Sequence, residues 1–130
     1  MRPLVLTALL TLAGTALAQD GNPRRGAADA VRDGHALYHQ HCARCHGANA
    51  VGKGEAAPDL RQLDRYCRRI AQADIRAACV RDNDVYFRLS VLKGKTKVGV
   101  EHMPPWDGVL DQDSIWAIKS YVESLSGDWR

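Results

Sequence analysis

The chain has 130 residues, a formal charge of +3 and 45% hydrophobic residues. This length accommodates one domain of ordinary size, and the presence of one short apolar run excludes a bundle of membrane-spanning helices. The charge is uneven: residues 61–97 contain ten Lys or Arg against four acidic residues, whereas residues 98–130 contain two against six. Such asymmetry either orients a protein towards a charged partner or marks a solvated face.

The first eighteen residues have the features of a secretory signal peptide. Arg2 gives a positive start, residues 4–17 are almost wholly apolar, and Ala16-Leu17-Ala18 forms a small-x-small cleavage site. Cleavage before Gln19 would leave 112 of the 130 residues. The alternative is an uncleaved anchor. We expect cleavage, without stable membrane insertion of the remaining chain.

Residues 19–28 predict a flexible leader because they are rich in Gly, Pro and Arg and poor in apolar residues. Residues 29–130 would then form the single folded domain. From about Ala30 the pattern becomes helical, and this first helix is expected to run into the segment that follows. The residues that recur at helical spacing are Val31, Gly34, Leu37, Tyr38 and His41.

Residues 42–46 read Cys-Ala-Arg-Cys-His, the attachment signature for a c-type haem. On one helical turn, Cys42 and Cys45 can each form a thioether to a haem vinyl carbon, and His46 can supply an imidazole to the iron. A zinc half-site and a redox dithiol are the alternatives for two cysteines at this spacing. One covalent haem c is the predicted cofactor. Export to the periplasm fits this chemistry, which belongs outside the reducing cytoplasm.

A glycine-rich loop is expected over residues 47–58, where the missing side chains allow close approach to a flat ligand. Residues 61–80 predict a broken helical segment. Asp82 is the predicted N-cap of a clearer helix that Gly94 ends.

A second loop is predicted over residues 95–110. It contains Met103, the single methionine left once the signal peptide is removed. The pair Pro104-Pro105 restricts the backbone and can hold the Met103 sulfur in place as the sixth ligand of the iron. A thioether ligand raises the reduction potential, which suits an electron carrier. The alternatives are His102 as the ligand and an open sixth position, which would indicate ligand sensing or peroxidase-like chemistry.

Two further cysteines, Cys67 and Cys79, remain once the haem takes its pair. In an oxidising compartment we expect a disulfide between them. A zinc site built from all four cysteines and a redox switch of free thiols are the alternatives.

The last helix is predicted to begin after Asp111, which is its N-cap. Its inner stripe is expected to consist of Ile115, Ile118, Val122 and Leu125, with Trp116 and Tyr121 beside it. The pattern contains no convincing strand. The predicted fold class is therefore all-α, with about four to five helices around one haem.

These residues resemble a class I c-type cytochrome over most of the chain after residue 18. The resemblance rests on Cys42-Ala-Arg-Cys45-His46, on Pro58-Asp-Leu60, on Met103-Pro104 and on the two terminal helices. It implies that the Pro58 carbonyl accepts a hydrogen bond from the ring of His46, and that Pro58 and Leu60 belong to the haem site. It also implies that the first and last helices cross at Gly34 and Tyr38, against Ile118 and Tyr121.

A closer similarity concerns Met103-Pro-Pro-Trp106-Asp-Gly108 and the last helix. These stretches are similar to soluble cytochromes c that accept electrons from quinoprotein alcohol dehydrogenases containing pyrroloquinoline quinone. The similarity implies such a dehydrogenase as electron donor, and a terminal oxidase or another cytochrome as acceptor. It implies a monomeric monohaem electron carrier, neither an enzyme nor a nucleic-acid-binding protein. Lys93, Lys95 and Lys97 are the candidates for electrostatic orientation. The remaining alternative is a tethered cytochrome subunit of a membrane respiratory complex.

Overall fold

The computed structural model describes residues 20–54 and 57–127. The predicted signal peptide, residues 1–18, lies outside these ranges. The described elements are α1 (Ala28–His41), α2 (Ala43–His46), the 3-10 helix η1 (Leu60–Gln62), α3 (Arg65–Arg68), α4 (Ala73–Lys93), β1 (Lys95–Lys97), β2 (Val100–Met103) and α5 (Gln112–Ser124). None of the described helices combines the length and the apolar character needed to cross a bilayer.

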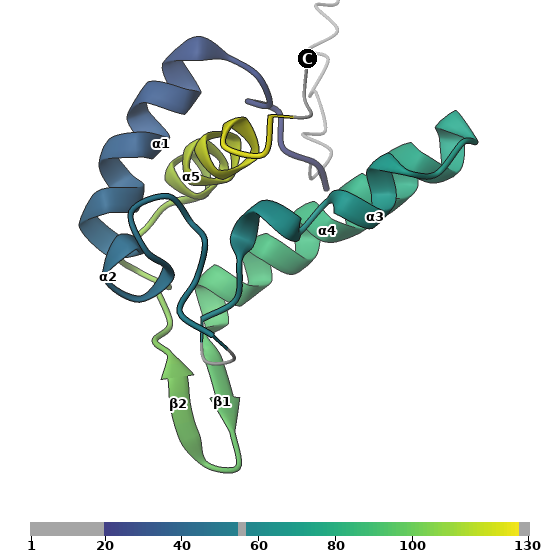
Figure 1. The fold of residues 1–130 in the computed structure, drawn as a ribbon. Coiled ribbons are helices and arrows are strands. Elements are labelled where there is room, and N and C mark those ends of the chain that lie inside the picture. Colours follow the sequence, from purple (N-terminus) through teal and green to yellow (C-terminus); the bar gives the residue numbers. More distant parts are fainter. Residues whose placement is uncertain (1–19, 55–56, 128–130) are drawn as a thin grey trace, which may run out of the picture.

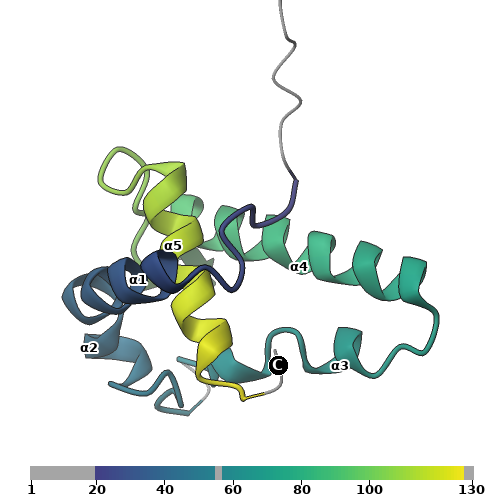
Figure 2. The ribbon, with the colours of Figure 1, turned by 90° about the horizontal axis from the view of Figure 1, so that it is seen from above.

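Helices α1 and α5 cross at the centre of the fold (Figures 1 and 2). Gly34 lies against the main chain of Ala117, where a Cβ atom would overlap the carbonyl oxygen. One turn later Tyr38 is fully buried, and its ring centroid lies 5.3 Å from that of Tyr121. This is the helix crossing that the sequence predicted.

The long helix α4 begins ten residues before the position that the sequence indicated, with Gln72 as its N-cap and Asp82 exposed in its interior. The predicted cap at Asp82 is therefore wrong. Residues 73–81 consist mainly of good helix formers, so the helix continues through Asp82, whose side chain remains solvated. The predicted end is correct, because Gly94 has a φ of 66° and its N–H donates to the Ser90 carbonyl.

A two-stranded antiparallel hairpin projects from the C-terminal end of α4, where the sequence predicted only a loop (Figure 1). The expectation of no strand is wrong at β1 and β2, although the fold class remains all-α. Val98 and Gly99 form the turn with φ values of 50° and 75°. Both values suit a two-residue hairpin turn, but valine rarely adopts this conformation, so the turn was hard to predict from its residues.

Residues 20–27 are packed against α4 and α5, so the prediction of a flexible leader is wrong for this part of the chain. Asn22 is buried, its N–H donates to Asp84 at 2.9 Å, and its side chain donates to Ser120 at 2.9 Å. Arg25 binds Asp84 and Glu123. Polar contacts thus hold a segment whose low apolar content indicated a loose chain.

Candidate haem-binding site

Cys42, Cys45 and His46 lie on one helical turn, as the signature requires. The N–H groups of Cys45 and His46 both donate to the Cys42 carbonyl, at 3.1 and 2.9 Å. Both thiols are free, that of Cys42 half-buried and that of Cys45 exposed. Burial raises the pKa of Cys42 to about 11, so its thiol is protonated at neutral pH.

The imidazole of His46 faces the carbonyl oxygen of Pro58, at 3.4 Å from Nδ1. With its proton on Nδ1, the ring donates to this carbonyl and leaves Nε2 for a metal. Burial lowers the pKa of His46, which favours the neutral imidazole that coordinates metals. The contact that the resemblance implied between these two residues is therefore present.

The loop between His46 and Pro58 is folded back on itself by main-chain hydrogen bonds. The Gly52 N–H donates to the His46 carbonyl at 2.8 Å, and the Leu60 N–H donates to the Ala50 carbonyl at 2.9 Å. At Gly52, with φ of 80°, a Cβ would overlap the Ala57 carbonyl. This position therefore requires glycine, and the fold of the loop brings Pro58 to His46.

Tyr38 forms a hydrogen bond to this loop that the sequence analysis missed. Its hydroxyl donates to the Gly47 carbonyl at 2.7 Å, immediately after His46. Burial raises the pKa of Tyr38, so this hydroxyl remains a donor across the neutral range. Its place in a helix crossing was predictable, but its hydrogen bond depends on how the loop turns.

Met103 is half-buried at the end of β2. The chain after Met103 is held to the end of α4, because Trp106 donates its N–H to the Val91 carbonyl at 3.0 Å. Gly94 lies against the Met103 carbonyl so closely that a Cβ would overlap it. His102, the alternative ligand, is exposed.

The structure brings several of the predicted site residues to one apolar cluster. Cys42, Leu60 and Met103 all pack against the core that contains Tyr38, Val91 and Ile118. His46 and Pro58 are joined directly. The assignment of these residues as thioether sites and axial ligands stays a prediction.

The lysines that the sequence singled out lie at the end of α4 and on β1. Lys93 is 3.7 Å from Asp107 in an exposed ion pair, and the Lys95 ammonium lies 4.3 Å from the centre of the Tyr86 ring. Lys97 is exposed. An exposed pair such as that of Lys93 contributes little to stability, and the role of these lysines in orienting a partner stays a prediction.

Cys67 and Cys79 are joined as a disulfide, with Cα atoms 5.5 Å apart. This geometry supports the predicted pairing over a zinc site made from all four cysteines. Within residues 20–54 and 57–127, no group of three or more His, Cys, Asp or Glu side chains could hold a metal ion.

A buried ion network that the sequence analysis missed lies between the N-terminus of α3, α4 and α5. Lys119 is 1% exposed and contacts Asp64 at 2.8 Å, Glu123 at 2.9 Å and Asp84 at 3.3 Å. Burial works against its charge, but the carboxylates of Glu123 and Asp64 outweigh this effect and raise the pKa of Lys119. In the sequence, this network was indicated only by the i,i+4 spacing of Lys119 and Glu123 in the last helix.

Comparisons with known proteins identify the family of the chain. A family model described as cytochrome c oxidase, cbb3-type, subunit III matches residues 29–122. The chain belongs to this family of c-type cytochromes. Cytochrome c550 of Pseudomonas aeruginosa is 35% identical over 99 residues, which are 76% of this chain and 58% of that protein. No solved structure matches the chain.

Two other relatives of this cytochrome are subunits of larger assemblies. The cytochrome bc1 complex cytochrome c subunit of Mycobacterium tuberculosis is 28% identical over 95% of this chain and 40% of its own length. The cbb3-type cytochrome c oxidase subunit FixP of a Bradyrhizobium species is 28% identical over 92% of this chain and 35% of its own length. The chain thus spans well under two thirds of these relatives.

Membership in the family identifies the cofactor as a covalently bound haem c. The residues present fit this cofactor. Two free thiols lie on the helical turn that ends at His46, and the Nδ1 contact with Pro58 leaves Nε2 of that histidine for iron.

Proposed function

We propose that this cytochrome carries single electrons through one haem held by Cys42, Cys45, His46 and Met103. The observation that carries the proposal is the contact between His46 Nδ1 and the Pro58 carbonyl, at 3.4 Å, beside two free thiols on the same turn. A ring held in this way presents Nε2 in one orientation. It is also a more basic ligand than an imidazole without this hydrogen bond.

The residues of the chain have distinct tasks in this proposal. The bound haem supplies the redox change of its iron, with no bond made to a substrate. Pro58 holds the imidazole, the half-buried Leu60 supplies an apolar contact, and Met103 offers a thioether that favours ferrous iron. The ties of the Met103 segment to α4, through Gly94 and Trp106, limit the movement of that sulfur.

Acidified acetone extraction tests covalent attachment. In the exported protein the red pigment should stay with the polypeptide, whereas Cys42→Ser with Cys45→Ser should release it or contain none. Cys67→Ser with Cys79→Ser is the matched control and should retain the pigment. Release of the pigment from the parent protein would overturn the proposal.

For the partners, we propose a periplasmic donor of the quinoprotein alcohol dehydrogenase class and a terminal oxidase or another cytochrome as acceptor. The proposal rests on the similarity of residues 103–108 and α5 to cytochromes that serve such dehydrogenases. Reduction of the haem-loaded protein by a purified quinoprotein alcohol dehydrogenase, followed at several salt concentrations, tests it. A fast rate that falls with salt supports the donor and indicates charge steering. A rate no faster than that of an unrelated dehydrogenase contradicts it.

A second candidate function is that of a cytochrome subunit tethered within a membrane respiratory complex. It is supported by the subunit III family match and by the two relatives that are named as complex subunits. Mass spectrometry of the N-terminus in exported material distinguishes the two. A chain that begins at Gln19 supports a separate electron carrier. A chain that keeps residues 1–18 supports a subunit tethered to the membrane.

A further inference from the structure

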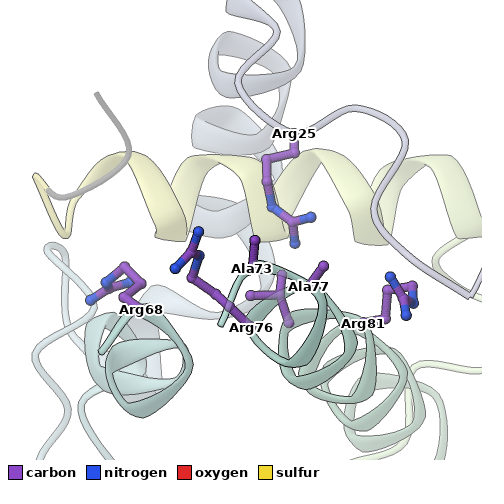
Figure 3. A pocket seen from close by; sticks show the side chains of 7 residues that line it. Arg25, Arg68, Ala73, Arg76, Ala77 and Arg81 are labelled. Atoms are coloured by element: carbon purple, nitrogen blue, oxygen red, sulfur yellow. The ribbon is translucent and has the colours of Figure 1, made fainter. Parts of the chain in front are cut away.

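A pocket of about 440 Å³ lies between residues 20–27, α3 and the N-terminal half of α4. Figure 3 shows arginine side chains from the three segments around it. Its lining consists of Arg25, Arg68, Ala73, Arg76, Ala77, Val80 and Arg81. None of these residues belongs to the proposed haem site.

The charges beneath the pocket are nearly balanced. Arg25 and Lys119 face three carboxylates, those of Asp64, Asp84 and Glu123, and the five groups together carry a charge of about −1. Arg25 is therefore committed to the buried network, although its side chain points into the pocket (Figure 3). Arg76 and Arg81 add further positive charge to the lining of the pocket.

Arg76 is positioned by the turn that joins α3 to α4. One of its guanidinium nitrogens donates to the Ile70 carbonyl at 2.6 Å and to the Ala71 carbonyl at 3.3 Å. These contacts fix the side chain without neutralising it. Among the described residues, no carboxylate forms an ion pair with Arg76 or with the exposed Arg81.

The disulfide fixes the spacing of the arginines. Cys67 directly precedes Arg68, and Cys79 lies on α4 between Arg76 and Arg81, so the bond joins the two walls of the pocket. A site that is rigid before its ligand arrives pays less entropy on binding. The disulfide-bonded segment is additional to the shortest cytochromes of this class. Besides stabilising the fold, the bond would hold the pocket arginines in position.

We propose that this pocket binds a small multivalent anion with carboxylate or phosphate groups. Guanidinium groups recognise both kinds of group through paired N–H donors, and the volume is that of a small-molecule site. Ala73, Ala77 and Val80 give the floor an apolar surface suited to a short carbon chain. The site is separate from the electron-transfer function, since it uses other residues of the fold.

Isothermal titration of the haem-loaded protein with citrate and with pyrophosphate tests the proposal, at constant ionic strength maintained with sodium chloride. The expected result is saturable binding of one anion per chain, and the stronger of the two ligands identifies the preferred chemistry. If neither anion gives a saturable signal above that of chloride, the proposal is overturned.

Variants assign the binding to the pocket. Arg81→Gln and Arg76→Gln should each weaken binding about tenfold or more, because each removes charge-assisted hydrogen bonds. Arg69→Gln removes the same charge from an exposed arginine of the same segment outside the lining, and should change affinity less than about twofold. Equal weakening by Arg69→Gln and Arg81→Gln would show only general charge attraction and would refute the site. Because Arg76 bonds to the main chain, Arg81→Gln decides the matter if Arg76→Gln fails to fold.

Discussion

Gly34 of α1 lies directly against the carbonyl group of Ala117 of α5, with no room for a side chain between the two main chains. Around this contact, Tyr38 and Ile118 are 0% and 1% exposed. The crossing therefore sets the position of the whole of α1, including the turn at its end that carries Cys42.

Gly34→Ala should destabilise the protein by about 1–3 kcal/mol, because the added methyl group forces the helices apart. The free energy of unfolding of the haem-loaded protein, measured with urea, checks this. Ala36→Ser, at an exposed position of the same helix, should change it by less than about 0.5 kcal/mol. An unchanged stability of Gly34→Ala would show that the crossing can relax.

Met103→Ala should retain the haem but lower its reduction potential, by a sizeable part of the roughly 0.8 V over which axial ligands set haem potentials. Added ligands such as imidazole should then bind the iron, and the absorption band of an iron–methionine sulfur bond should disappear. His102→Ala, which removes the exposed neighbour, should leave the potential and the band unchanged. A parent-like potential in Met103→Ala would exclude Met103 as the ligand.

Replacement of both Cys67 and Cys79 by serine should cost roughly 2.5–3 kcal/mol of stability, since the bond closes a loop with a sequence separation of 12. The haem absorption spectrum should be unaffected because the pair lies outside the haem site. Urea unfolding and the visible spectrum of the same samples check both parts. A changed haem spectrum would show that the α3 segment supports the haem site directly.

Lys119→Met should destabilise the protein by about 3–5 kcal/mol, because it leaves three carboxylates with Arg25 as their remaining cation in the network. Lys97→Met, at an exposed site, serves as the control and should cost less than about 0.5 kcal/mol.

The difference in stability between the parent protein and Lys119→Met should depend on pH. The pKa of Lys119 is raised by folding above its ordinary value of 10.5, so its contribution is fully present below pH 10.5 and is lost as pH rises through the higher, folded value. The stability difference between the parent and Lys119→Met should therefore be constant from neutral pH to about 10.5 and shrink above it. A difference that shrinks already near neutral pH would show that Lys119 is not held in its charged form.

Local sequence patterns predicted several features correctly. Asp111 caps α5, since its carboxylate accepts the Ser114 N–H at 2.8 Å, and Gly94 ends α4. The spacing of Cys42, Cys45 and His46 predicted their common turn. Each of these features depends on contacts within a few residues, so the order of the residues alone was enough to specify it.

What the tertiary structure decided involves residues far apart in the chain. Residues 20–27 looked loose because the carboxylates that hold Arg25 are nearly 60 and 100 residues away. Likewise, Lys119 pairs with Asp64, which is distant in the sequence, and the pocket arginines come from three separate segments. A charge can be buried only where its partners converge, and that convergence is a property of the folded chain rather than of any local pattern.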